Sequence, residues 1–242
     1  MTSTWLEARD STHSLEEVDT YRRHLFLGGL HGSGAQELHE VLLQHPQLAG
    51  LKSGDAHLLQ GQDLQRVRVG DDYLGGAGAF ALHPRIRQLA SRPFTTPERD
   101  SMLADWRQHW GDDTTTETRW VEYSPCNLLR VRSLADAFPG AHQIVVVRHP
   151  LADAYVTRDE INEHDFPLCD LVEHWIAAHE IYQRDRLGVK NLTTIHAEDL
   201  ADKPQELLDQ ITRLLGLDPF SFDSRSLRTL SAKEHLSRWS NE

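Results

Sequence analysis

A short apolar segment that runs into a glycine-rich turn is the feature that most constrains how this chain folds. Residues His24 to Leu30 (HLFLGGL) are mostly apolar, and the turn Gly28 to Gln36 (GGLHGSGAQ) follows at once. Apolar residues then recur at helical spacing from Gln36 to Gln44, until His45-Pro46 ends the pattern. This order predicts a buried strand, a tight turn and a helix.

Three further segments have the composition of buried strands. Gln143 to Arg148 (QIVVVR) and Asn191 to His196 (NLTTIH) are short and β-branched, and Thr118 to Glu122 resembles them. Helical patterns lie between these segments, at Pro97 to Trp110, Asn127 to Ala137, Leu168 to Arg186 and Lys203 to Leu215, the last followed by Gly216 as a C-cap. Strands that alternate with helices predict an α/β fold with a central parallel sheet flanked by helices.

The chain has neither an internal repeat nor a linker, which predicts a single domain over residues 1–242. Residues 51–92 are poorly patterned and contain the glycine-rich stretch Gly75 to Phe80, with a possible helix near Leu58 to Val69. Such an insertion either forms a lid or acceptor-site wall, or is a surface excursion without a role.

Charge and hydropathy exclude two classes of function. The 25 Lys and Arg against 37 Asp and Glu give a net charge of −12, with no basic stripe, which argues against a nucleic-acid partner. The longest aliphatic run, Ile144 to Val147, is far shorter than the roughly 20 residues of a membrane span. The first residues lack the order of a signal peptide, so we expect a cytoplasmic protein whose two cysteines, Cys126 and Cys169, stay reduced.

The glycine-rich turn is a candidate anion site. A loop that leaves a buried strand and opens a helix directs backbone N–H groups and the helix dipole at the same point. The nucleotide-triphosphate pattern GxxxxGK followed by Ser or Thr is absent, which disfavours magnesium-assisted phosphoryl transfer. The alternative is a turn that binds nothing.

Arg148 is the second candidate anion-binding residue. It ends a predicted strand, and Pro150 begins the next helix, in which Thr157 lies two turns on. Because the carboxyl ends of parallel strands share one edge of the sheet, Arg148 is placed to hold a second phosphate by paired hydrogen bonds, with the Thr157 hydroxyl beside it. The alternative is a surface salt bridge.

Four segments in order resemble the sulfotransferase family. They are LFLGGLHGSGAQELHEVLLQHPQLAGL (Leu25 to Leu51), WVEYSPCNLLRVRSLADAFPGAHQIVVVRHPLADAYVT (Trp120 to Thr157), the helix around HWIAAHE (His174 to Glu180) and IHAEDLADKPQELLDQITRLLGLD (Ile195 to Asp218). Family members show GLxRSGTT, VEKSPxNLxR, VRxPxxxxxS/T and YEDLxxxPxxxLxxIxxFLGL at these places.

This resemblance implies a three-layer P-loop-type fold that uses 3'-phosphoadenosine-5'-phosphosulfate (PAPS) as sulfate donor. The 5'-phosphosulfate would lie over Leu30 to Gln36, and Arg148, with Thr157 or a neighbour, would clamp the 3'-phosphate. The acceptor would be a hydroxyl or amine of a small molecule, and no metal is required. The donor-binding loop positions would be Gly32, Ser33, Gly34, Ala35 and Gln36.

The chain departs from the family pattern where the cations are expected. Gly32 stands where the family has Lys or Arg, and Tyr123 stands where it has the Lys of the EKSP-like segment. Ala35 and Gln36 replace its two threonines. The side chains that can take over are His31, Gln36, Arg130 and Arg132.

His31 and His57 are the candidate catalytic residues. His31 lies in the loop itself, where a histidine can act as acid, base or anion donor, although it can also serve only to bond the adjoining backbone. His57, Asp55 and Asp63 lie in the segment that could border the acceptor, and each is also consistent with a solvated side chain. No histidine spacing typical of a metal site occurs, so we expect none.

Three functions remain open from the sequence. The first is sulfuryl transfer from PAPS to a small molecule, and the second is another reaction on a natural-product intermediate that uses His31. The third is a non-catalytic binding scaffold. The tryptophans Trp106, Trp110 and Trp175 are expected in the core, and Trp239 either closes over a nucleotide or frays with the terminus. Oligomeric state is left open.

Overall fold

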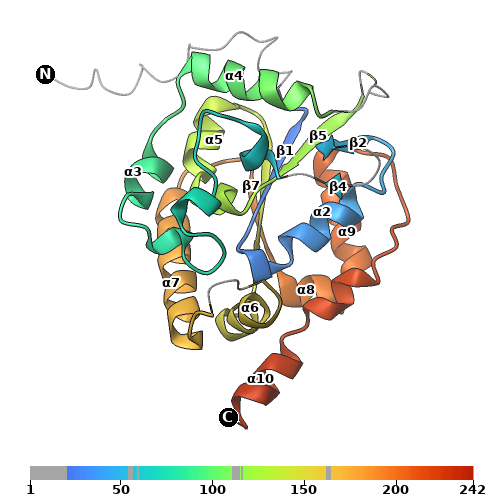
Figure 1. Cartoon of the computed structure of the whole chain (residues 1–242). Helices are drawn as coiled ribbons and strands as arrows, with labels where there is room; N and C mark the ends of the chain where they lie inside the picture. The colour runs from blue at the N-terminus through green and yellow to red at the C-terminus, as the bar shows by residue number, and fades with distance from the viewer. Residues whose placement is uncertain are drawn as a thin grey trace, which may run out of the picture.

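The computed structural model describes residues 21–53, 57–58, 60–110, 115, 117–161 and 165–241. They form a five-stranded parallel sheet in the order β2-β5-β1-β6-β7, with a short antiparallel pair, β3 and β4, beside it. Helices cover both faces of the sheet (Figure 1), which confirms the expected three-layer α/β fold. The strands are β1 (His24–Gly28), β2 (Leu48–Gly50), β3 (Lys52–Ser53), β4 (His57–Leu58), β5 (Arg119–Tyr123), β6 (His142–Val147) and β7 (Leu192–His196).

The helices follow the predicted alternation closely. Figure 1 shows α2, α8 and α9 on one side of the sheet and α5 and α7 on the other. The α-helices are α2 (Ala35–Leu42), α3 (Ile86–Ser91), α4 (Thr96–Arg107), α5 (Val131–Ala137), α6 (Pro150–Val156), α7 (Leu168–Asp185), α8 (Ala197–Asp202), α9 (Pro204–Leu215) and α10 (Lys233–Trp239). Shorter turns are η1 (His31–Ser33), η2 (Gly61–Leu64), η3 (Asp72–Leu74), η4 (Phe80–Leu82), η5 (Pro125–Leu129), the π-helical η6 (Thr157–Ile161) and η7 (Ser226–Leu230).

Alternation along the central strand β1 divides the core between the two faces. Leu25 and Leu27 point to the face covered by α2, α8 and α9, whereas Phe26 between them packs among residues of α4 and α5. All three side chains are fully buried, and each such burial stabilises the fold by about 1.5–3 kcal/mol. Both faces of β1 are therefore covered, as a central parallel strand requires.

The register of the sheet brings three strand ends together. Leu27 of β1 lies beside Tyr123 of β5, and Gly28 lies beside Val145 of β6. The segments that leave these strands therefore emerge at one edge of the sheet, which is where ligands bind in open parallel sheets. The described part of the chain contains no helix that is both long enough and apolar enough to span a membrane.

The expected helix at Leu58 to Val69 is wrong. Leu58 ends the short strand β4, and η2 is the one helical turn among the described residues of this range. Gln65 explains why the helix does not form. Its side-chain Oε1 accepts hydrogen bonds from the backbone N–H groups of Val67 (2.8 Å) and Arg68 (2.7 Å), and its Nε2 donates to the carbonyl of Gln62 (3.0 Å). These bonds compete with the helical pattern. The strand β2 was not predicted, because it has only three residues.

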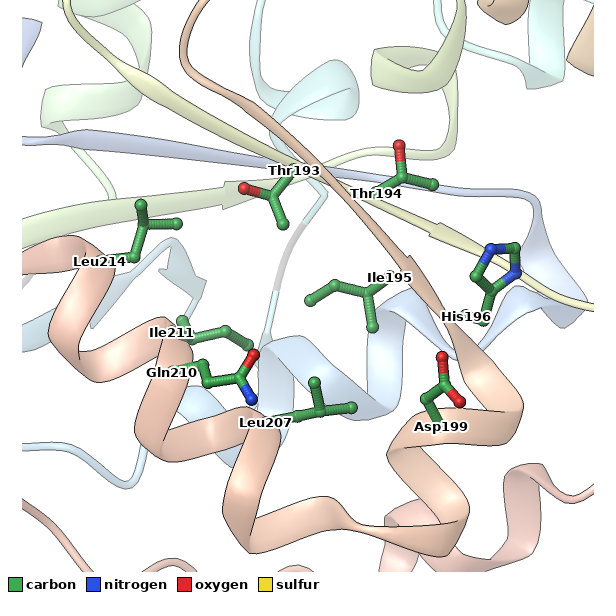
Figure 2. A pocket seen from close by; sticks show the side chains of 9 residues that line it. All are labelled: Thr193, Thr194, Ile195, His196, Asp199, Leu207, Gln210, Ile211 and Leu214. Carbon is green, nitrogen blue, oxygen red and sulfur yellow. The ribbon is translucent and has the colours of Figure 1, made fainter.

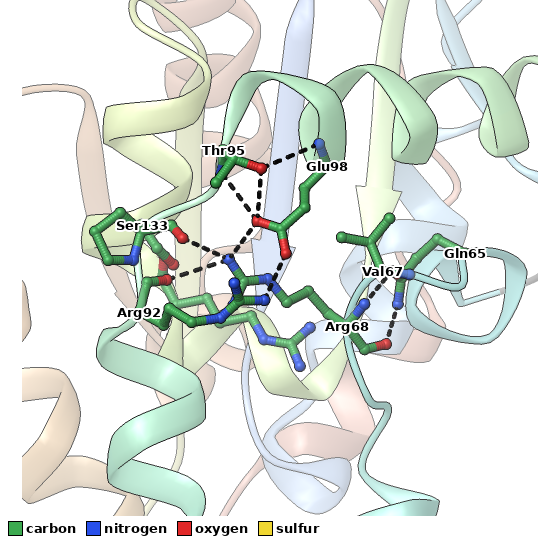
Figure 3. Close-up of polar contacts among 9 residues, drawn as sticks. Gln65, Val67, Arg68, Arg92, Thr95, Glu98 and Ser133 are labelled. Carbon is green, nitrogen blue, oxygen red and sulfur yellow. Dashed lines mark hydrogen bonds and ion pairs between the residues drawn. The ribbon is translucent and has the colours of Figure 1, made fainter.

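A buried arginine fixes this irregular segment to the start of α4 (Figure 3). The Arg68 guanidinium donates to the carbonyls of Arg92 (3.3 Å) and Pro93 (2.8 Å), and it lies 3.6 Å from a carboxylate oxygen of Glu98. Glu98 also closes the capping box of α4 with Thr95. The insertion is thus held by polar contacts at this point, where the sequence suggested a helix.

Candidate functional site

The glycine-rich turn forms a strand, a 3-10 turn and a helix in immediate succession. The N–H of Ser33 donates to the carbonyl of Leu30 (2.9 Å), and its hydroxyl accepts from the N–H of Ala35 (3.3 Å). Gly34 adopts a φ of 91° between η1 and α2. This left-handed conformation favours glycine, and a Cβ at residue 34 would also meet the end of the Leu230 side chain of η7 at 2.7 Å.

Gly32 is pressed against helix α6. A Cβ atom at this residue would lie 2.6 Å from the backbone carbonyl oxygen of Asp153 and 3.1 Å from the hydroxyl of Thr157. Backbone oxygens of a helix move little. The turn therefore lies too close to α6 for residue 32 to carry a side chain. The position at which the family pattern has a cation therefore has no room for one in this arrangement.

Arg148 lies at the same place as the turn. It follows β6, is buried, and donates from Nη1 to the carbonyl of Gly32 (3.0 Å) and from Nη2 to the carbonyl of Thr229 (3.4 Å). Its own carbonyl accepts from the indole N–H of Trp175 on α7 (3.1 Å). Thr157 is buried at the end of α6, against Gly32. The structure thus brings Gly32, Arg148 and Thr157 together.

His31 forms an ion pair with an aspartate of the insertion. Its Nε2 lies 2.7 Å from Oδ2 of Asp71, which is almost fully buried, and its Nδ1 has no hydrogen-bond partner among the described residues. Burial opposes ionisation of Asp71, but the hydrogen bond and charge of His31 outweigh it and lower the pKa of the carboxyl, with help from the amide of Gln62. In the neutral imidazole, the hydrogen bond to the carboxylate places the proton on Nε2 and leaves Nδ1 as an acceptor.

Further carboxylates surround the turn. Asp153 is buried beneath it, where desolvation raises its pKa to about 7 although Arg148 and His31 oppose the shift. Partial burial and the carboxylates of Asp71 and Asp72 raise the pKa of Asp63 to about 6. The side of the turn that faces the insertion is therefore more acidic than basic.

Tyr123 occupies a buried place beside β1. Its ring lies 5.8 Å from that of His39, and burial raises the pKa of its hydroxyl above the usual range. Its neighbour Glu122 is buried too, accepts hydrogen bonds from Ser124 and Asn127, and has a pKa raised by desolvation to about 7. Neither residue supplies a positive charge to the turn.

The other candidate residues are more widely placed. Gln36 is exposed and donates along α2 to Glu40 (3.1 Å), while Ala35 is buried. Arg130 donates to the carbonyl of Val69 (2.5 Å), and Arg132 donates to the carbonyl of Leu187. His57 lies on β4, where only its backbone is described, and Asp55 lies outside the described residues.

Of the tryptophans expected in the core, Trp106 is buried and donates to the carbonyl of Gly61 (2.8 Å), whereas Trp110 and Trp175 are partly buried. Trp239 is half exposed on α10.

Sequence reasoning missed the partners that close the site. Asp71 and Gln62 lie in the unpatterned insertion, and Thr229 and Leu230 come from the far end of the chain. No local pattern points to any of them. Comparison with the family motif shows only that residue 32 lacks the cation. The close approach of the turn to the Asp153 carbonyl gives the reason, because it leaves no room for a side chain.

A separate cavity of about 300 Å³ lies between the edge strand β7 and helices α8 and α9 (Figure 2). Neither the turn nor Arg148 lines it, so it is distinct from the candidate site. Its walls are formed by Thr193, Thr194, Ile195, His196, Asp199, Leu207, Gln210, Ile211 and Leu214. Among the described residues, no group of three or more His, Cys, Asp or Glu side chains is arranged to hold a metal ion.

A parallel sheet with helices on both faces and a glycine-rich turn between β1 and α2 is the architecture of the P-loop-type α/β proteins. The chain belongs to the sulfotransferase family, whose model matches residues 24–221. A comparison with curated proteins found no match.

Solved sulfotransferases share the fold. STF1 from Mycobacterium tuberculosis H37Rv is 17% identical, with 94% of this chain and 79% of that chain covered and a TM-score of 0.57. A sulfotransferase from Alicyclobacillus acidocaldarius is 20% identical (89% and 90% covered, TM-score 0.51), and STF9 from Mycobacterium avium is 12% identical (91% and 71% covered, TM-score 0.56). At these identities the likeness shows the fold alone.

Proposed function

We propose that this protein transfers a sulfuryl group from PAPS to a hydroxyl or amine of a small molecule. The observation that supports the proposal is the contact between Arg148 and the turn, with the guanidinium 3.0 Å from the carbonyl of Gly32 and Thr157 beside it. A guanidinium favours one phosphate and a strand-turn-helix unit favours another, so the two together support a site for two anionic groups of one nucleotide.

His31 is the proposed general base. As the lone pair of the acceptor forms a bond to sulfur, the bond from sulfur to the bridging oxygen breaks, and its electron pair leaves with adenosine 3',5'-bisphosphate. The proton of the acceptor goes to Nδ1 of His31, the nitrogen that has no described partner while Asp71 holds Nε2.

The absence of the two family cations lowers the expected rate of sulfuryl transfer. A preorganised donor at a developing negative charge contributes about a hundredfold to a thousandfold to the rate, or roughly 3–4 kcal/mol. Gly32 and Tyr123 supply none. Turnover should therefore be slow compared with a family member that has both cations, and backbone N–H groups of the turn carry more of the stabilisation.

A second candidate function is favoured by the absence of room at Gly32 and by the carboxylates beside His31. Acids repel a polyanionic donor, and a turn seated on α6 is consistent with a site that no longer needs a cation. In this alternative the His31–Asp71 pair carries out acid–base chemistry on a different small molecule, without PAPS.

The experiment is incubation of the purified protein with PAPS and a panel of alcohols and amines, followed by mass spectrometry. Sulfuryl transfer predicts two products in equal amounts, adenosine 3',5'-bisphosphate and a sulfated acceptor. Both should be lost in His31→Ala and retained in Asp202→Asn, a control at an exposed position. Neither product, at any enzyme concentration at which the protein is folded, would exclude the proposal and leave the second candidate.

A further inference from the structure

The insertion forms an acidic wall beside His31, which we define as Asp63, Asp71 and Asp72. Asp71 contacts His31 directly, and the carboxylates of Asp71 and Asp72 are close enough to Asp63 to raise its pKa. Asp71 is buried, whereas Asp63 and Asp72 are exposed. The wall therefore combines one buried carboxylate with two exposed ones.

Gln62 adds a buried hydrogen-bond acceptor next to this wall. Its side chain is 5% exposed, and its Nε2 donates to Oε1 of Gln60 (2.7 Å) and to the carboxylate of Asp71. These two bonds fix which end of the amide is nitrogen. The remaining atom, Oε1, is buried and has no hydrogen-bond donor among the described residues, although it belongs to the same amide that touches Asp71.

The unsatisfied groups are hydrogen-bond acceptors. Oε1 of Gln62 can only accept, and Nδ1 of His31 accepts while Nε2 carries the proton toward Asp71. The carboxylates of the wall are acceptors as well. A buried acceptor left without a donor costs free energy, so the site is complementary to a group that brings donors.

Resting on the proposed function, we propose that the acceptor substrate is an amine, bound through its ammonium group by the acidic wall and Gln62. An ammonium brings two or three N–H donors and a positive charge, and its bonds to carboxylates are charge-assisted. An alcohol brings one donor and no charge, and a carboxylate or phosphate ester is repelled.

With an amine as acceptor, the reaction forms a bond between nitrogen and sulfur. The bound ammonium first gives one proton to solvent or to a carboxylate of the wall, which frees the nitrogen lone pair. The nitrogen then bonds to sulfur, adenosine 3',5'-bisphosphate leaves with the electrons of the broken S–O bond, and the second N–H proton goes to His31. The product is a sulfamate.

The test is binding of matched amine and alcohol probes in the absence of any nucleotide. Calorimetry and thermal shift at low ionic strength compare benzylamine with benzyl alcohol, phenethylamine with 2-phenylethanol, and 1,4-diaminobutane with 1,4-butanediol. The variants are Asp63→Asn and Asp72→Asn, both at exposed positions that leave the core intact, and Gln62→Leu, with Asp202→Asn as the matched surface control.

We expect the amine of a pair to bind more tightly than its alcohol, and each wall variant to weaken it by about tenfold or more while the control leaves it unchanged. Equal binding of amines and alcohols, unchanged affinity in the wall variants, or no binding of any amine would overturn the inference. Amine binding without PAPS turnover would support the amine site and refute the proposed function. PAPS turnover with alcohols alone would support the proposed function and refute the amine site.

Discussion

Replacing Gly32 with alanine is the sharpest perturbation of the turn. The new Cβ would lie 2.6 Å from the carbonyl oxygen of Asp153 and 3.1 Å from the hydroxyl of Thr157. The hydroxyl can rotate away, but the carbonyl belongs to α6 and cannot. The turn must therefore lift from α6, which also strains the bond from Arg148 to the carbonyl of residue 32.

The magnitude follows from the cost of overpacking. Forcing one methyl group into a packed site costs about 1–3 kcal/mol of unfolding free energy. A chain of this size loses roughly 2–4 °C of melting temperature for each kcal/mol, so we expect Gly32→Ala to melt roughly 2–12 °C below the parent. Gly32→Lys should melt at least as low and should gain no donor binding, although it restores the cation of the family pattern.

The assay is thermal and urea unfolding of Gly32→Ala beside a matched glycine variant. Gly70→Ala serves as control, because a Cβ there would meet its nearest atom, Oδ1 of Asp63, at an ordinary 3.5 Å. It should stay within about 0.5 kcal/mol of the parent. A Gly32→Ala protein as stable as the parent would refute the reasoning that the turn has no room for a side chain.

Three further predictions concern ionisation and the C-terminal helix. Burial raises the pKa of Asp153 from 3.8 to about 7. The stability linked to its proton is therefore fully present below about pH 4 and is lost as the pH rises through 7. Asp153→Asn should reduce that loss when urea unfolding is measured between pH 4 and pH 7. Asp71→Asn should lower kcat/KM by about a hundredfold or more, because His31 loses its fixed tautomer, and should change the pH profile of the reaction; an unchanged profile would deny Asp71 this positioning role. Arg238→Ala should speed hydrogen exchange in α10, which has no buried residue and is held partly by the ion pair with Asp159, at a cost in overall stability below about 1 kcal/mol; unaltered exchange would show that other contacts hold the helix.

The sequence predicted the elements whose signals are local. The strand at His24 to Gly28, the glycine turn and the helix after it are written in consecutive residues, and Gly216 ends α9 in the left-handed conformation expected of a C-cap. The meeting of Arg148 with the turn was also accessible, because two parallel strands that end at one edge bring their following residues together.

The parts that were missed depend on contacts between distant residues. Leu230 lies against Gly34, and the carbonyl of Thr229 accepts from Arg148, although no pattern links the ends of the chain. In the insertion, side-chain bonds of Gln65 replace the periodic backbone bonds that a helical pattern reports. Asp71 could not be singled out, because a lone aspartate in an unpatterned segment has no signal until the fold places it 2.7 Å from His31.

Calorimetric titration with adenosine 3',5'-bisphosphate tests most directly whether the turn and Arg148 form a donor site. The account predicts that the parent protein binds this nucleotide, that Arg148→Lys weakens binding by about tenfold or more because paired donation is lost, and that Arg213→Lys at an exposed position of α9 leaves binding unchanged. A parent protein that takes up no nucleotide, or an Arg148→Lys variant that binds it equally well, would contradict the assignment.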